Sequence, residues 1–474
     1  MAAKRDKRGL SQYRNEYLAA IAATFSLLAT VAAAGWSSPA IPALKQDDSP
    51  VPITANQGSW IVSILSIGSL FGPIITGLAV DRYGPKRTLL LSVIPLAIGW
   101  VIIVFASNVH IIYAARFLHG ISYGTAYSVT PIYLGEISSN AIRGSTGVLI
   151  TVMAKFAFLL EYSIGPYVDF RSLAWISLTF PVIFFILFFW MPESPYYLLA
   201  HNRDKEALST LRWLRRSDES SEQIEKEFTQ MKALVQKTQH DESSLNNLFA
   251  RSNRKSLGII LLLSCGMQLT GINAILGYAQ TIFSKLEMEL NAAELSIILA
   301  SVQLIAVFIP TFFVDRAGRR PLLLLSTGGS LFALIACSVY FTFDAFDYPT
   351  ETLSWVPFVS TLGFIVSFAL GLATVPFAIL SEIFPKSIKA NANAVFAMVT
   401  SLVVFVVVKL FQVISDSAGT YVSFWIFSGC TACTGVLIHF FIPETRGKSF
   451  EEIQEIMTVE SSSKEKTKCL PLLC

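Results

Sequence analysis

Two amide side chains stand in an otherwise apolar stretch of the sequence, residues 257–283. Gln268 and Asn273 lie on either side of Gly271 there. If this stretch crosses a bilayer, polar side chains are costly unless they face a cavity or a partner. An amide both donates and accepts hydrogen bonds, which suits a hydroxyl group that also does both, and the glycine allows the segment to bend. We therefore take Gln268 and Asn273 as the best ligand-binding candidates; the alternative is that they hold neighbouring helices together.

A charged residue, Lys155, interrupts a second apolar stretch, residues 144–168. Thr151 precedes it by four residues, so on a helix the two side chains share one face. Glu161 follows at a spacing that does not share that face, so we expect no ion pair between Lys155 and Glu161 within the segment. Lys155 is expected to point into a cavity, where it either selects an anionic or phosphorylated substrate or is held by a partner that the sequence does not identify.

The elements that must position these residues are membrane helices, as the composition indicates. The chain has 474 residues, of which 53% are hydrophobic and 15% charged, whereas soluble domains carry roughly 25% charged residues. Apolar stretches of about 20 residues, the length that crosses a hydrocarbon layer of ~30 Å, recur along nearly the whole chain. The sequence predicts an all-α membrane protein with twelve transmembrane helices. Their expected spans are 18–44, 58–80, 88–106, 111–134, 144–168, 172–191, 257–283, 293–314, 321–343, 355–380, 391–414 and 421–442.

The distribution of lysine and arginine predicts the orientation, because cytoplasmic loops carry an excess of both. Basic residues gather at both termini and in every second loop, whereas the opposite loops offer only Lys45, Arg171 and Lys285. We expect a multi-pass protein of the plasma membrane with both termini in the cytoplasm. The lipid bilayer is then its surroundings, and no nucleic-acid partner is implied.

One long polar interruption, residues 192–256, divides the spans into two sets of six. Its apolar positions recur at helical spacing, which predicts short amphipathic helices on the cytoplasmic face; a solvated linker is an equally good reading of its second half. These positions are Leu208, Leu211, Leu214, Ile224, Phe228, Met231 and Leu234. The predicted parts are an N-terminal bundle (1–191), this linker, a C-terminal bundle (257–442) and a cytoplasmic tail (443–474).

Charged motifs recur in the same order in the two halves, which indicates an internal repeat. They lie at the expected cytoplasmic ends of the helices, where the charges can pair. The matched positions are Asp81 and Arg82 with Asp315 and Arg316, Glu136 and Arg143 with Glu382 and Lys389, and Glu193 with Glu444. The halves are therefore read as paralogous six-helix bundles, with a substrate path expected between them.

The ordered set of these motifs resembles the sugar porter family of the major facilitator superfamily over essentially the whole chain. The resemblance also rests on the closing motifs Pro192-Glu193-Ser194-Pro195 and Pro443-Glu444-Thr445-Arg446-Gly447, and on the segment from Gln268 to Ala274. The segment from Gly35 to Ala40 looks most like the insect trehalose-transporter-like branch. The resemblance implies the major facilitator fold and transport of a sugar, a hexose or trehalose, by alternating access.

For the charged motifs, the resemblance implies networks that stabilise the outward-facing state and separate when the cytoplasmic side opens. Exposed pairs contribute only ~0 to 1 kcal/mol each, so such a switch must rest on the whole network. The alternative is that these charges only set the topology. In the seventh span, Tyr278 matches one of two gating tyrosines of the family, and Gly277 replaces the other.

Several candidate substrate contacts depart from the pattern of hexose carriers. Thr151 stands where many of them have a glutamine, and Gln303 replaces an asparagine of the eighth span. The proline-rich and tryptophan-containing motif of the tenth span is reduced to Pro376 and Phe377. Phe377 either stacks on a pyranose ring or serves only for packing. We keep Thr151, Gln303 and Phe377 as substrate-binding candidates, and Pro376 as a gating candidate.

Proton symporters of the family place an aspartate of the first span close to an arginine of the fourth. The arginine corresponds to Arg116, but the matching site in the first span is Ser37, and no acid occurs between Tyr17 and Gln46. We therefore expect facilitative transport without proton coupling, in which Glu161 could substitute only if it reached the cavity.

The alternatives are a proton-coupled sugar symporter and a non-transporting sugar sensor, of which the short tail disfavours the sensor. No enzymatic activity, cofactor or metal is expected, and the protein is expected to function as a monomer.

Overall fold

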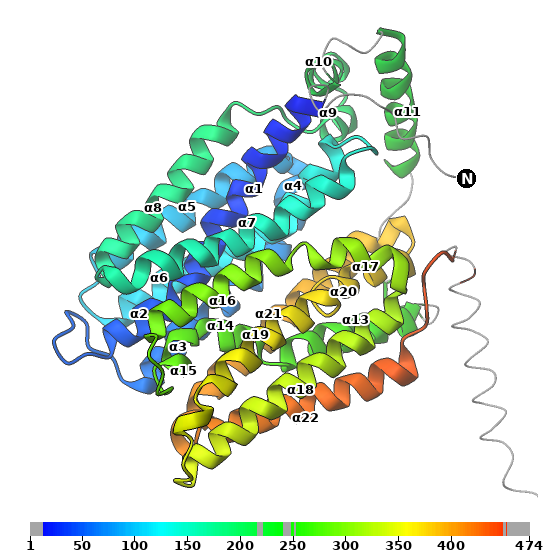
Figure 1. The fold of residues 1–474 in the computed structure, drawn as a ribbon. Coiled ribbons are helices and arrows are strands. Elements are labelled where there is room, and N and C mark those ends of the chain that lie inside the picture. The colour runs from blue at the N-terminus through cyan, green and yellow to red at the C-terminus, as the bar shows by residue number, and fades with distance from the viewer. Residues whose placement is uncertain (1–12, 216–220, 240–247, 251–252, 449–451, 453–474) are drawn as a thin grey trace, which may run out of the picture. The chain divides into compact units, whose positions relative to one another are not determined.

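The computed structural model describes residues 13–215, 221–239, 248–250, 253–448 and 452, which are mostly α-helical (Figure 1). Ten helical segments in this part of the chain are long and apolar enough to cross a membrane. The other two expected spans are α6 (Val109–Ile137), which carries more polar side chains, and α16 (Ala292–Ala306), which continues after a break as α17 (Ile309–Ala317). These segments account for the twelve predicted transmembrane helices.

Two compact units divide the described residues. The first comprises those of Met1–Ile53 and Ile64–Glu242, and the second those of Thr54–Ser63 and Ser243–Cys474. Helix α3 (Ala55–Ser69) therefore begins in the second unit and ends in the first. The other membrane helices of the first unit are α1 (Arg14–Gly35), α2 (Ser37–Leu44), α4 (Phe71–Tyr83), α5 (Pro85–Val104), α6, α7 (Arg143–Ile164) and α8 (Phe170–Phe189).

Glycines allow α3 and α4 to approach α6 closely in the first unit. A Cβ atom on Gly68 would lie 2.2 Å from the carbonyl oxygen of Phe117, and one on Gly120 would lie 2.1 Å from that of Leu65. Gly72 of α4 stands in the same relation to Gly124 of α6. Small residues at helix interfaces are typical of membrane proteins, where close backbone approach replaces the hydrophobic effect as a source of packing energy.

The described residues of the polar interruption include the helices α9 (Pro195–Ala200), α10 (Asp204–Arg215) and α11 (Ser221–Gln239). Their apolar faces pack against one another in a cluster that includes Leu211 and Met231. Leu234 differs from the predicted pattern because its side chain is 46% exposed. Residues 216–220 and 240–247 of this region lie outside the described residues.

The second unit contains the remaining helices. They are α13 (Arg254–Leu269), α14 (Ile272–Gly277), α15 (Ala279–Phe283), α16, α17, α18 (Arg319–Ala345), α19 (Trp355–Leu370), α20 (Val375–Ile383), α21 (Lys386–Ala418) and α22 (Thr420–Phe441). Aliphatic and aromatic side chains from five of them form a buried cluster that includes Leu263 of α13, Leu323 of α18 and Phe396 of α21.

Three spans of this unit are not continuous helices. The seventh is broken at Gly271 and again at Tyr278, the eighth at residues 307–308, and the tenth at residues 371–374. Broken helices expose backbone groups and are tolerated at membrane depth where they line a cavity or are buried in protein. The breaks in the seventh span contain the predicted residues Gly271 and Tyr278, and the break in the tenth span lies just before Pro376 and Phe377.

Candidate functional site

The break in the seventh span requires a glycine at position 271. Gly271 has a φ of +83°, a left-handed conformation that disfavours any side chain. A Cβ atom at this position would also lie 2.4 Å from the ring of Phe427. Helix α13 ends at Leu269 and α14 begins at Ile272, so Gln268 and Asn273 stand on opposite sides of the break.

The two predicted amides are hydrogen-bonded to each other. Asn273 Nδ2 donates to Gln268 Oε1 at 2.5 Å, and the Gln268 side chain is buried. The bond uses one donor of Asn273 and the carbonyl of Gln268, so Asn273 Oδ1 and Gln268 Nε2 are the atoms suited to a ligand hydroxyl. The pair joins two parts of one span, which differs from the interhelical link considered as the alternative.

Two further predicted residues present buried polar atoms without a hydrogen-bond partner among the described residues. They are the hydroxyl of Tyr278 and Oε1 of Gln303. The Tyr278 ring stacks obliquely on Phe411 of α21 with centroids 5.4 Å apart, and Gln303 lies on α16, which packs against α15. An unpaired buried polar atom costs about 1–3 kcal/mol, so both atoms favour binding of water or a hydroxylated ligand.

Thr151 and Lys155 lie on α7 of the first unit, and both are half-buried. The ammonium nitrogen of Lys155 is 5.8 Å from the ring centroid of Phe158, a distance at which a cation is attracted to an aromatic face. This aromatic partner of Lys155 belongs to the same helix, α7. Whether Lys155 also selects a charged substrate remains a prediction.

Arg116 joins α6 to the break between α1 and α2. Its guanidinium donates to the carbonyl of Ala33 and, at 2.8 Å, to Ser37 Oγ. It also lies 5.5 Å from the ring of Trp36, the residue at the break. Ser37, which the sequence analysis matched to the acid of proton symporters, is thus in contact with the arginine.

An acid nevertheless reaches this region from a different helix. Glu161 of α7 is 1% exposed and interacts electrostatically with Arg116. Glu161 packs against α1, because a Cβ atom on Gly35 would lie 3.1 Å from the Cβ atom of Glu161. Glu161 Oε1 accepts a 2.6 Å hydrogen bond from Ser177 Oγ, and Oε2 has no partner among the described residues. The spacing of residues along one helix does not predict that Glu161 lies close to Arg116, because this contact forms where three helices meet.

The two predicted residues of the tenth span, Pro376 and Phe377, have different surroundings. Pro376 is buried in the first turn of α20, a position that needs no backbone N–H. Phe377 is 50% exposed and makes an edge contact with Phe396 of α21 at 5.2 Å between centroids. This contact shows a packing role for Phe377, while stacking on a sugar stays a prediction.

At the ends of the spans, two of the predicted acids cap helices. Glu193 Oε1 accepts from the backbone N–H of Lys86 at 2.9 Å, near the start of α5. Glu444 accepts from the N–H groups of Arg319 and Arg320, at 3.0 and 3.1 Å, at the start of α18. A carboxylate is favoured there because the first N–H groups of a helix lack partners and carry partial positive charge. The same type of capping contact therefore occurs once in each half of the internal repeat.

The two caps differ in their electrostatics. Burial raises the pKa of Glu193 above its usual value, and the backbone donors only partly offset this. Burial also raises the pKa of Glu444, but the N–H donors of Arg319, Arg446 and Arg320 outweigh it and lower the pKa overall. Glu444 is the more firmly ionised of the two.

Glu382 forms an ion pair, as predicted for these motifs, but its partner is not one of the predicted gating residues. Its Oε1 lies 2.9 Å from Arg319 Nη2, and its Oε2 accepts from Thr445 Oγ1 at 2.5 Å. The sequence feature that could have indicated Arg319 as the partner is its position directly after Gly318. In the first half, Pro85 occupies the matching position, so Glu136 has no equivalent arginine.

The other predicted charges differ in their exposure. Asp81, Arg82 and Arg143 are exposed, and the Arg82 guanidinium lies 5.3 Å from the ring of its neighbour Tyr83. Lys389 is half-buried. The side chains of Asp315 and Arg316 lie outside the described residues.

A network of ion pairs and hydrogen bonds around the buried Arg215 in the first unit was not predicted from the sequence. Arg215, at the end of α10, lies 3.0 Å from Glu16 of α1 and 2.8 Å from Glu227 of α11. It also donates to the carbonyl of Ile137 at the end of α6, and Glu16 accepts from Ser139 N–H. The network fixes the linker helices to the membrane helices. The isolated acid near the start of the first span was the available signal.

Comparison with known proteins identifies the family. Residues 17–457 match the family model described as "Sugar (and other) transporter". The chain belongs to the sugar transporter family. It is 31% identical over 458 residues to the facilitated trehalose transporter Tret1 of Apis mellifera ligustica, covering 95% of this chain and 90% of the relative. It is also 31% identical to Tret1 of Bombyx mori, with 94% and 87% covered.

Solved structures confirm the major facilitator fold for this sugar transporter. The proton:xylose symporter XylE bound to 6-bromo-6-deoxy-D-glucose superposes with a TM-score of 0.76 at 21% identity, covering 94% of this chain and 99% of that one. An inward-open structure of XylE from E. coli gives a TM-score of 0.77 at 21% identity, with 93% and 99% covered. The protein is thus a multi-pass membrane protein with the predicted fold, and the proteins it resembles are transporters.

Proposed function

We propose that this member of the sugar transporter family carries a sugar, a hexose or trehalose, down its concentration gradient by alternating access. The observation that carries the proposal is the broken seventh span with its amide pair, Gln268 and Asn273. Discontinuous helices form substrate sites in many transporters, and these amides offer both donors and acceptors. The name of the 31%-identical relatives, facilitated trehalose transporter, supports the sugar and the facilitative mode.

The location follows from the same reading. We propose that the protein lies in the plasma membrane as a functional monomer with both termini in the cytoplasm, which the distribution of lysine and arginine supports. It is proposed to act on a small-molecule sugar, with neither a nucleic-acid partner nor an enzymatic activity.

The test is uptake into proteoliposomes that contain the purified full-length protein. Radiolabelled glucose, trehalose and a polyol are offered one at a time, without a pH gradient. We expect saturable uptake of glucose or trehalose, with an internal concentration that rises to the external one and does not exceed it. Unlabelled substrate should compete with this uptake. Absence of uptake of every sugar, with specific binding retained, would instead support the sensor reading.

Proton-coupled sugar transport is the second candidate, because Glu161 lies buried beside Arg116. The first span has no carboxylate near that arginine. Oε2 of Glu161, which has no hydrogen-bond partner among the described residues, is the atom that could carry a proton. The discriminating measurement is sugar accumulation driven by an inward proton gradient. Accumulation that is lost in Glu161→Gln, with equilibrative uptake retained, would establish coupling; equal behaviour of both proteins would exclude Glu161 as the coupling group.

A further inference from the structure

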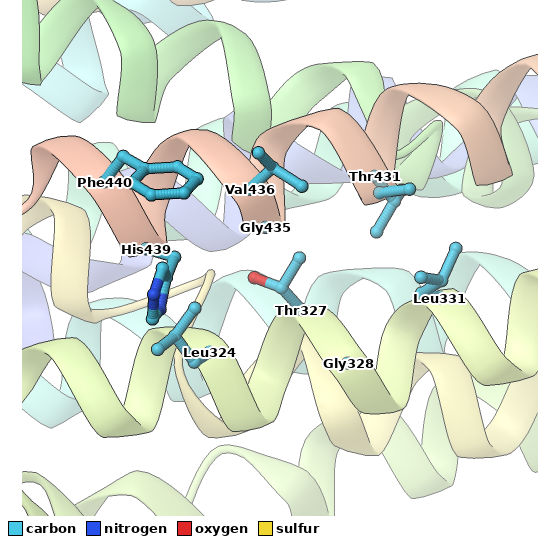
Figure 2. A pocket seen from close by; sticks show the side chains of 10 residues that line it. Leu324, Thr327, Gly328, Leu331, Thr431, Gly435, Val436, His439 and Phe440 are labelled. Carbon is cyan, nitrogen blue, oxygen red and sulfur yellow. The ribbon is translucent and has the colours of Figure 1, made fainter.

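A groove lies between α18 and α22 of the second unit, and all of its lining residues come from these two helices (Figure 2). Its volume is about 370 Å³, within the range of about 300–1,000 Å³ that is usual for ligand pockets. The hollow forms where both helices carry glycine, because a Cβ atom on Gly328 would meet nothing within 4 Å, and Gly435 faces the methyl group of Thr327. The groove is therefore open space between two membrane-spanning helices.

The lining of this groove is mostly hydrocarbon, with the imidazole of His439 at one end. Leu324 and Leu331 line it from α18, and Val436 and Phe440 from α22. The hydroxyl protons of its two threonines are used within their own helices, because Thr327 Oγ1 donates to Leu323 O and Thr431 Oγ1 to Phe427 O, each at 2.7 Å. Such a surface offers little to a sugar and suits an alkyl chain.

The surface around the groove is of the kind that faces lipid. Phe332 of α18 is 78% exposed, and Phe440 of α22 is 65% exposed. Both helices are long and apolar enough to span a membrane. Water is absent from the hydrocarbon layer, so a hollow at this depth is filled by a lipid chain or by another apolar group.

One end of the groove carries positive charge. Arg320 stands one helical turn before Leu324, and its Nη2 donates to the carbonyl of His439, which itself lines the groove. That bond uses one of the five N–H donors of the guanidinium. The nearby carboxylate of Glu444 is already occupied by the backbone N–H groups of Arg319, Arg320 and Arg446. The remaining donors of Arg320 are suited to a phosphate oxygen.

We propose that the groove between α18 and α22 is a binding site for an anionic phospholipid, with one acyl chain along Gly328 and Gly435 and the phosphate at Arg320. The lipid comes from the leaflet at the Arg320 end of the helices. The combination of an alkyl-lined hollow and a basic end matches both parts of such a lipid, whereas a sterol carries no anionic group for Arg320. The site is independent of the sugar-binding residues.

The experiment is photo-cross-linking of the full-length transporter in phosphatidylcholine vesicles. They contain a trace of phosphatidylglycerol or phosphatidylcholine with a photoreactive acyl chain. We expect the phosphatidylglycerol probe to label peptides that contain residues 324–331 and 431–440 in preference to other lipid-facing segments. Gly328→Leu should abolish the preference by filling the hollow, and Arg320→Gln should reduce labelling by phosphatidylglycerol to that given by phosphatidylcholine.

The matched control is Gly363→Leu, which changes another exposed glycine with open space around it, on α19 outside the groove. It should leave the labelling unchanged, and each variant must retain sugar uptake to show that it is folded. Equal labelling by the two probes would overturn the assignment to an anionic lipid. Displacement of the probe by a sterol, or labelling that persists in Gly328→Leu, would overturn the site itself.

Discussion

Individual side chains of the seventh span give the most direct test of sugar binding. Asn273→Ala should weaken substrate binding, because truncation leaves Gln268 Oε1 and a sugar hydroxyl without their partner, at a cost of about 1–3 kcal/mol. Since 1.4 kcal/mol corresponds to about tenfold in affinity, binding of the transported sugar should weaken measurably in purified protein. The amount of protein in the membrane should be normal. Unchanged affinity would mean that Asn273 only stabilises the break in the helix.

Tyr278 allows a sharper experiment because its ring and its hydroxyl have separate surroundings. The ring stacks on Phe411, and the buried hydroxyl has no partner among the described residues. Tyr278→Phe keeps the ring and removes the unpaired group, so the melting temperature without sugar should stay equal or rise. Sugar affinity should fall if the hydroxyl binds substrate. Tyr278→Phe with unaltered affinity would limit this residue to packing or gating.

At the scale of elements, a glycine turn leads into each capped helix. Gly84 precedes α5 with a φ of +87°, and a Cβ atom on it would lie 2.7 Å from Glu193 Oε2. Gly84→Ala should therefore strain the turn and displace the cap, which lowers the melting temperature. Gly77→Ala, in the preceding helix with open space at its Cβ position, is the matched control. Equal melting temperatures for the two variants would show that the cap does not stabilise the first unit.

The ion pair between α18 and α20 is proposed to influence conformation without touching substrate. Glu382→Gln removes the charge that holds Arg319 and should favour the inward-open state, because a contact made in one state stabilises only that state. Accessibility of introduced cysteines should rise from the cytoplasmic side and fall from the other. Glu136→Gln is the control with the smaller expected effect, since Pro85 replaces the arginine there. The opposite shift would remove the gating role from Glu382.

For the whole molecule, the central prediction is uptake that does not depend on protons. Ser37 contacts Arg116 but cannot exchange a proton near neutral pH. Sugar uptake by cells that express the transporter should therefore survive an uncoupler and vary little with external pH. Accumulation that collapses with the proton gradient would contradict this and assign coupling to Glu161.

Much of this protein was determined by the sequence alone, because the responsible physics is local. The length of apolar stretches and the thickness of a bilayer set the twelve spans, and the repeated loop motifs indicated two paralogous halves. The glycine between Gln268 and Asn273 also marked the break in the seventh span, since a left-handed residue is readable from its type.

Contacts between distant segments were decided only by the tertiary structure. Glu161 meets Arg116 because α1, α6 and α7 converge, and no spacing along one helix predicts such an approach. Glu193 and Glu444 bind backbone N–H groups at helix starts, although their sequence neighbours suggested side-chain ion pairs. The groove at Gly328 and Gly435 exists because two glycines, more than a hundred residues apart by their numbers, face the same gap. A hollow is a property of two packed surfaces, and the sequence of either helix by itself does not contain it.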